Sequence, residues 1–233
     1  MIEKDFPNDD DQFIVNWYEL IESDVELIVP ASSYDASKDN RLLIPYMKDH
    51  HIGFVNKMAE PIVNPEYDIY KGSILKESDL IIVGKRYTYG YPRSNGEVQT
   101  FDNYKWGVID SKGTIVIKCE YYWIFISDDN QLITLKTYNH SYSVVDRNNN
   151  VIVPSGKYNF IDGFTKGFSR IIKNNKWGII DYTGNVVLPP EYDEIWNFYN
   201  WQNLNSCRVI KKGDIERRFV FATGKLDAND SHF

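Results

Sequence analysis

The chain has 233 residues and a formal net charge of −7, with 42% hydrophobic and 25% charged residues. This composition is ordinary for a folded globular protein and excludes an intrinsically disordered one. The acidic balance argues against a nucleic-acid partner, because a phosphate backbone would meet net repulsion.

The sequence contains no apolar run of the roughly 18 residues that a spanning helix needs, so we expect no membrane insertion. Its first residues do not resemble a secretory signal, and we expect a cytoplasmic protein. Cys119 and Cys207 are expected to be free thiols. Aromatic residues make up 15% of the chain, which favours β-structure.

A short motif recurs along the chain at intervals of about 35 residues. Its glycine, or the residue in its place, stands at Gly53, Gly107, Ser143, Gly178 and Arg218. A tyrosine preceded by glutamate follows the glycine at one fixed distance in three copies, at Tyr67, Tyr121 and Tyr192. Two marks that keep their separation indicate an array of similar units.

We expect a single repeat domain over 1–233 whose first and last units depart from the pattern. In chain order its parts are a degenerate cap at 14–46, a unit at 47–84, an insertion at 85–103, units at 104–135, 136–167 and 168–205, a degenerate cap at 206–227 and a tail at 228–233.

Each unit is predicted to be a short three-stranded antiparallel meander. In the best copy, strands at 168–173 and 177–181 flank a tight turn at Asn174-Asn175, and a third strand at 186–188 ends at Pro189. The segment 192–196 is a candidate fourth edge strand. Because such short strands cannot bury an apolar face alone, the sheets must stack, in an all-β array of five to six units that is closed and propeller-like or open and superhelical.

Two features that recur between copies of the motif have structural explanations. Asp110 and Asp181 stand three residues before Gly113 and Gly184, the order typical of a type I turn whose first side chain caps backbone amides. The motif glycine after Trp106 or Trp177 would leave a depression on the sheet, into which we expect an aromatic ring such as Tyr192 to lie flat.

The repeated Asp110, Asp146 and Asp181 can also be interpreted as acid–base carboxylates, but a turn role explains every copy. Neither cysteine has a second thiol or a histidine at ligand spacing, and no nucleotide-binding motif occurs. We therefore expect no enzyme, no catalytic residue, no metal and no cofactor.

The Lys-Trp-Gly segments at 105–107 and 176–178, each followed by an aliphatic pair and aspartate, resemble the WG repeats, also called KWG repeats. The resemblance extends to the segments 164–167 and 186–189 and to Tyr192-Asp193, and it covers roughly residues 47–224. It implies a β-rich array that acts as a binding or scaffold module.

Residues that break the repeat are the candidates for binding, since the scaffold does not require them. The insertion interleaves Tyr87, Tyr89, Tyr91 and Arg93, and is either a contact surface or a hairpin that covers a sheet edge. A second breach contains Tyr199 and Trp201, in a cluster that serves either packing or contact.

We expect a non-catalytic protein-binding module, and one concrete form is an inhibitor or immunity-type protein that masks a basic partner. The alternative is a module that binds glycan or cell envelope through exposed Trp and Tyr. Rings aligned along a groove would favour sugar, whereas an aromatic patch rimmed by charge would favour protein.

Overall fold

The computed structural model of the chain describes residues 26–27, 43–56, 58–71, 79–198, 205–211 and 215–227. These residues form five antiparallel sheets of four strands each. Contacts divide the chain into two compact units, residues 1–120 and residues 121–233. The described part of the chain contains no helix that is long and apolar enough to cross a membrane.

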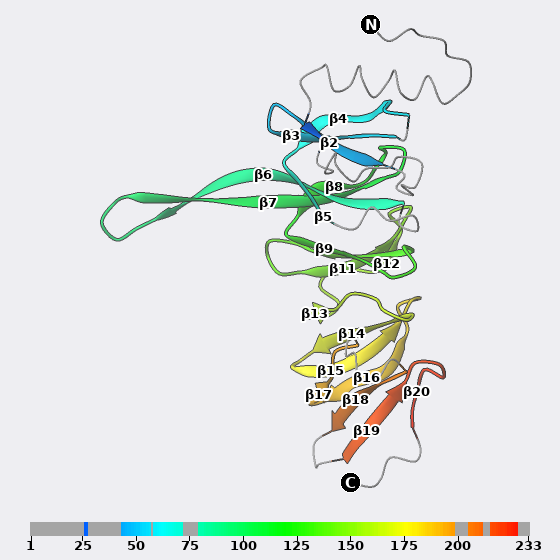
Figure 1. Cartoon of the computed structure of the whole chain (residues 1–233). Helices are drawn as coiled ribbons and strands as arrows, with labels where there is room; N and C mark the ends of the chain where they lie inside the picture. The colour runs from blue at the N-terminus through cyan, green and yellow to red at the C-terminus, as the bar shows by residue number, and fades with distance from the viewer. Residues whose placement is uncertain are drawn as a thin grey trace, which may run out of the picture. The chain divides into compact units, whose positions relative to one another are not determined.

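The first unit holds two sheets. The first sheet contains β1 (Glu26–Leu27), β2 (Ile44–Lys48), β3 (His51–Val55) and β4 (Pro61–Tyr67). The second contains β5 (Ile69–Lys71), β6 (Leu80–Pro92), β7 (Val98–Asp110) and β8 (Ile115–Tyr121) (Figure 1).

The second unit holds three sheets. The third sheet contains β9 (Trp123–Ile126), β10 (Leu132–Lys136), β11 (Tyr142–Asp146) and β12 (Val151–Val153). The fourth contains β13 (Phe160–Ile161), β14 (Phe168–Lys173), β15 (Lys176–Asp181) and β16 (Val186–Tyr192). The fifth contains β17 (Glu194–Ile195), β18 (Ser206–Lys211), β19 (Ile215–Val220) and β20 (Lys225–Leu226).

The all-β fold of repeated meanders is confirmed, with four strands to a sheet where the sequence indicated three. The additional strand is the segment that follows the Glu-Tyr pair, and it joins the next sheet along the chain. Ile195, in the segment expected as an edge piece, pairs with Val209 of β18. The sheets are therefore offset from the units expected from the repeat.

The third strand of the fourth repeat does not stop at its prolines, as the sequence suggested. β16 runs through Pro189 and Pro190 to Tyr192. It lies at the edge of its sheet, where a missing N–H leaves no partner unsatisfied. Its pairing with β15 jumps from Trp177↔Tyr192 to Ile179↔Leu188, so β16 bulges opposite Gly178.

The bulge explains the motif glycine. A Cβ built on Gly178 would lie 2.7 Å from the Leu188 carbonyl oxygen and 2.9 Å from the Pro190 nitrogen. A Cβ on Gly53 or Gly107 would likewise lie 2.6 Å from the carbonyl oxygen of Val63 or Ile117. The expected contact of an aromatic ring with the motif glycine is found at Gly53, where the Tyr46 ring is close. At Gly178 the expectation is wrong, because the nearest atoms belong to the backbone of Leu188 and Pro190.

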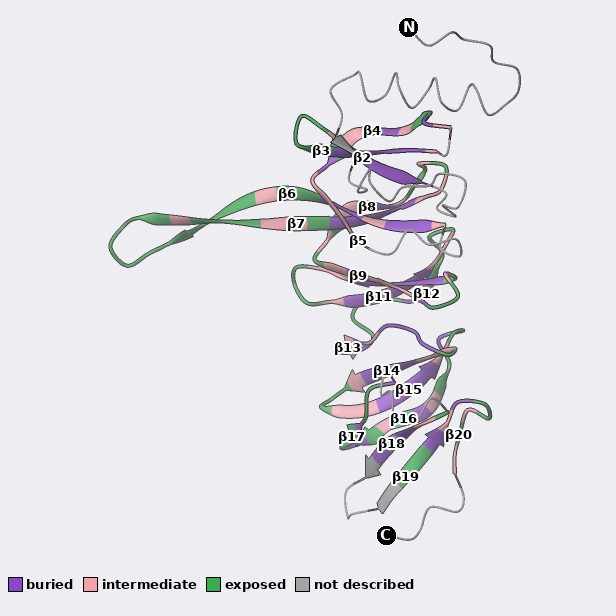
Figure 2. Ribbon diagram, viewed as in Figure 1, coloured by how far each residue is buried: buried purple, intermediate pink, exposed green. Residues whose placement is uncertain are grey.

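The apolar cores lie between successive sheets of one unit. In the second unit, one cluster joins Val144 of the third sheet to Ile171 and Ile180 of the fourth. Another joins Ile179 of the fourth sheet to Val209 and Phe219 of the fifth. Ile179 and Ile180 are adjacent and both fully buried, because neighbouring residues of a strand face opposite sides of the sheet. Figure 2 shows this burial along the inner strands.

The turns follow the repeated aspartates and asparagines. The Asp181 carboxylate accepts the backbone N–H of Thr183 at 2.9 Å and of Asn185 at 3.0 Å, and Gly184 takes a φ of 81°. Asp110 accepts the N–H groups of Lys112 and Thr114 in the same way. This is the pattern that the turn interpretation requires. Asn174 and Asn175 both have positive φ, as the tight hairpin between β14 and β15 demands.

Replacing Gly178 with alanine should lower the free energy of unfolding by about 2–3 kcal/mol, because the added methyl group meets backbone that cannot rotate away. Guanidinium denaturation measures this loss. Gly90→Ala is the matched control, since its Cβ would meet only the side-chain end of Val98 in an exposed strand. Equal stability of the two variants would contradict the close approach.

Candidate functional site

The insertion forms a long two-stranded hairpin that projects from the second sheet (Figure 1). β6 and β7 pair without interruption from Leu80↔Asp110 to Pro92↔Val98. β5 pairs with β6 only as far as Gly84, so eight residues of β6 continue beyond it, about 27 Å of extended chain. The hairpin extends away from the sheets and does not lie along a sheet edge (Figure 1).

The root of the hairpin is fixed by packing and by two carboxylates. Trp106 lies across Gly84, its partner on β6, with ring carbons 3.2 Å from a Cβ built on that glycine. The Lys71 ammonium lies over the indole of Trp106, 3.8 Å from the ring centroid. Asp68 accepts the Arg86 backbone N–H at 2.6 Å, and Glu66 accepts Lys85 Nζ at 2.7 Å. The hairpin therefore leaves the sheet in a defined direction.

One face of the hairpin carries a stripe of aromatic rings, which we call the ring face. Tyr89 and Phe101 are directly paired and stack with centroids 5.7 Å apart, and Tyr87 adjoins Tyr89 at 6.0 Å. Tyr91 extends the stripe toward the turn. Alternate residues of a strand share one face, which is why three tyrosines at every second position gather here.

Cationic groups border the ring face at both ends. The Lys105 ammonium lies 5.4 Å from the centroid of Tyr87 near the root. Arg93, in the turn, donates through Nε to Gln99 Oε1 at 2.9 Å, and Gln99 is paired with Tyr91. The guanidinium is thereby held beside the last ring of the stripe.

The opposite face is polar and internally bonded. Thr88 Oγ1 donates to Asp102 Oδ1 at 2.8 Å, Arg86 stands 3.9 Å from the other oxygen of that carboxylate, and the Arg86 guanidinium lies near the Tyr104 ring. Most of the binding potential of this face is used within the hairpin. The ring face is therefore the better candidate for contact with another molecule.

The ring face is exposed. Tyr91 is 65% exposed, Tyr89 44% and Phe101 40%, whereas Tyr87 is only partly exposed. Figure 2 shows the exposed residues along the outer part of β6 and β7. Residues 85–105 contain four cationic and two anionic side chains, a net charge of +2, so the rest of the chain carries −9. A basic aromatic surface thus projects from an acidic protein.

Sequence reasoning identified Tyr87, Tyr89, Tyr91 and Arg93, and the structure brings all four to one hairpin. It missed Phe101 and Lys105, which the return strand supplies. Only the observed register, which is centred on Asn95, places Phe101 opposite Tyr89. The other two candidates, Tyr199 and Trp201, lie outside the described residues. Near them Phe198 is buried in the core, and Trp196 is 37% exposed.

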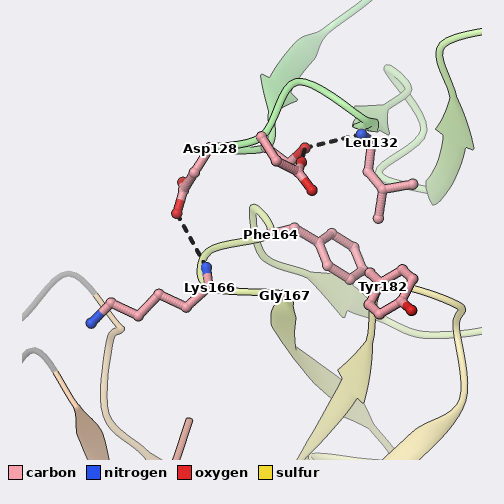
Figure 3. A pocket seen from close by; sticks show the side chains of 8 residues that line it. Asp128, Leu132, Phe164, Lys166, Gly167 and Tyr182 are labelled. Atoms are coloured by element: carbon pink, nitrogen blue, oxygen red, sulfur yellow. Dashed lines mark hydrogen bonds between the residues drawn. The ribbon is translucent and has the colours of Figure 1, made fainter. Parts of the chain in front are cut away.

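A pocket of about 340 Å³ lies in the second unit (Figure 3), lined by Ser127, Asp128, Asp129, Leu132, Phe164, Lys166, Gly167 and Tyr182. Its polar groups tie the surrounding turns together. Asp128 accepts the backbone N–H of Lys166 at 3.1 Å, and Ser127 Oγ accepts that of Leu132 at 2.9 Å. The pocket therefore lies where these turns meet, and the Asp128 carboxylate already bonds the backbone of one of them.

The repeated aspartates belong to turns. Hydrogen bonds from the Asn150 side chain and backbone hold the pKa of Asp146 below its usual range. In the described residues no three His, Cys, Asp or Glu side chains form a group suited to a metal ion.

Neither described thiol is activated for chemistry. Burial raises the pKa of Cys119, and it raises that of Cys207 to about 12. We therefore expect Cys207 to resist a thiol reagent such as dithionitrobenzoate at pH 8 in the native protein and to react at once in guanidinium. Rapid labelling of Cys207 under native conditions would contradict its place in the core. The variant Cys119→Ser allows Cys207 to be followed alone.

The chain matches a family model described as "WG containing repeat" over residues 106–132, 142–177 and 177–200. No curated protein matches the sequence. Among solved structures, the chain is similar to Kluyveromyces lactis Hsv2, with 12% identity, a TM-score of 0.39, and 80% of this chain and 59% of that chain covered. It is also similar to the WD40 beta-propeller domain of Doa1, with 14% identity, a TM-score of 0.31, and 83% and 65% covered.

The chain thus spans less than two thirds of the length of either structure. The family model matches three consecutive segments, and they include both Trp-Gly motifs and the strands that follow them. The resemblance to WG repeats that the sequence indicates is thus matched by the family model over these three segments.

Proposed function

We propose that the protein is a non-catalytic binding module that contacts another protein through the ring face of the β6–β7 hairpin. The observation that carries this proposal is the exposure of three adjoining rings on an element that the stacked sheets do not need. Large apolar side chains exposed together mark interaction surfaces more often than chance. Three of the large hydrophobic residues exposed in the described chain are on the ring face, namely Tyr89, Tyr91 and Phe101, and Val98 is exposed on the opposite face.

The composition of the surface supports a protein partner. Tyrosine, phenylalanine and arginine are enriched in protein interfaces, where rings bury much area at a small cost in side-chain entropy. The rings lie on an open ribbon rimmed by Lys105 and Arg93. The glycan alternative called for rings along a groove, and this arrangement does not favour it.

The charge of the hairpin favours an acidic partner, because a net charge of +2 on the projecting element steers association toward negative surfaces. An inhibitor that masks a basic partner would have to use the rest of the chain, which carries −9. An acidic partner would bind the hairpin, whereas a basic partner would bind the rest of the chain. The ring face supports the acidic partner.

Replacing Tyr87, Tyr89, Tyr91 and Arg93 with serine should reduce recovery of protein partners from a nuclease-treated native lysate by at least about tenfold. The control carries Val151→Ser and Val186→Ser, two exposed hydrophobic residues outside the hairpin. Quantitative mass spectrometry of the co-purified proteins is the measurement. Recovery of the same partners by both variants would contradict the proposal, and binding that glycosidase treatment abolishes would favour the glycan alternative.

A further inference from the structure

The hairpin has a second feature besides its rings, namely a backbone edge. Within the described residues, β6 and β7 pair only with each other beyond Gly84 and Trp106. A two-stranded ribbon is marginally stable alone, and a third strand adds hydrogen bonds and buries one side of the stripe. Which edge is open can be deduced from the hydrogen-bond pattern.

The turn fixes which backbone groups point outward. Arg93 N–H donates to Glu97 O at 2.7 Å, which closes the hairpin. In an antiparallel pair, hydrogen-bonded and non-hydrogen-bonded pairs alternate from that point. The backbone groups of Val98, Thr100 and Asp102 on β7 therefore point away from β6, as do those of Thr88 and Gly90 away from β7.

Two contacts at the root support this deduction. The N–H of Arg86 and the carbonyl oxygen of Gly84 fall on the outward side of β6 in the same alternation. Both are engaged there by Asp68, the first by its carboxylate at 2.6 Å and the second by its backbone N–H at 2.9 Å.

The outer edge of β6 is blocked at both ends. Asp68 occupies the Arg86 N–H, and Pro92 has no N–H to offer. On β7, the Tyr104 N–H is bonded to Asn103 Oδ1 at 2.8 Å. The segment from Val98 to Asp102 remains, and no backbone group of the described residues bonds the outward N–H of Thr100 or Asp102. β7 therefore offers the outward N–H groups of Val98, Thr100 and Asp102, whereas β6 offers only those of Thr88 and Gly90 between its two blocked ends. The edge of β7 is the longer open edge of the hairpin.

We infer that an extended acidic segment of a protein partner adds to β7 as a third strand along Val98–Asp102. This inference rests on the proposed function and specifies the partner's chemistry. On the ring face, one side chain of the added strand lies beside Phe101, and Lys105 stands three residues beyond Asp102, near the end of that strand. An apolar residue suits the first position and a carboxylate the second. On the opposite face of the hairpin, the Asp102 carboxylate repels acidic side chains. In the added strand, acidic residues on the ring-face side therefore alternate with neutral residues on the other side.

A phage-displayed library of nine-residue peptides, selected on the full chain, tests this inference. The selected peptides should carry carboxylates on one face of an extended strand. Thr100→Pro should weaken their binding at least about tenfold, since it removes an outward N–H and crowds the added strand without breaking the β6–β7 ladder. Thr88→Pro removes an outward N–H from the shorter edge of β6, together with the Thr88–Asp102 hydrogen bond, and should leave the affinity within about twofold. Fluorescence anisotropy gives both values.

Exchange of the backbone amides provides a readout that needs no proline. A selected peptide should slow hydrogen exchange at Thr100 and Asp102 of the unmodified chain and leave Gly90 unchanged. Equal weakening by the two prolines, or equal protection of both edges, would overturn strand addition.

Loss of binding in Tyr89→Ser but not in Thr100→Pro would also overturn strand addition and would retain the proposed function. A selection that yields no peptide sensitive to any hairpin substitution would overturn both.

Discussion

Burial of one sheet's apolar face by the next sheet is the interaction on which this structure depends. Each sheet has four strands, most of them short apart from β6 and β7, and several edge strands have only two or three residues. Such strands are too short to stabilise a sheet by backbone pairing alone. Stability must therefore come from the clusters between sheets, where residues such as Val144, Ile171 and Ile180 are fully or almost fully buried. Fully burying one such side chain contributes about 1.5–3 kcal/mol relative to exposure.

Close stacking explains where the glycines of the repeat occur. The motif glycine lets the bulged neighbouring strand of its own sheet approach its backbone closely. The turn glycine serves the neighbouring sheet, because a Cβ on Gly113 would lie 2.8 Å from Val63 and one on Gly184 would lie 3.0 Å from Ile152 O. At both turn positions, the positive φ and the close neighbour each favour glycine over any other residue. Within the described residues, the outer half of the projecting hairpin pairs with no other strand, so its side chains are free of this constraint.

The sequence could predict what is local and repeated. The aspartate turns, the asparagine hairpin and the strand at 168–173 follow from short-range chemistry that recurs in each copy. It could not predict that β16 continues through Pro189, because proline is excluded from central strands and tolerated at an edge, and edge position is a property of the assembled sheet. The assignment of β17 to the next sheet is equally non-local. At the candidate site, the period-two tyrosines predicted one face, whereas Phe101 depended on the register of the return strand.

Native-state hydrogen exchange of Ile171→Ala in the full chain tests most directly whether the cores exist only between sheets. Ile171 belongs to the fourth sheet but packs in the cluster that contains Val144 of the third. The substitution should cost about 3 kcal/mol, and the amide protection of Val144 should fall together with that of the fourth sheet. Loss of protection confined to the fourth sheet, with Val144 as protected as before, would contradict the account.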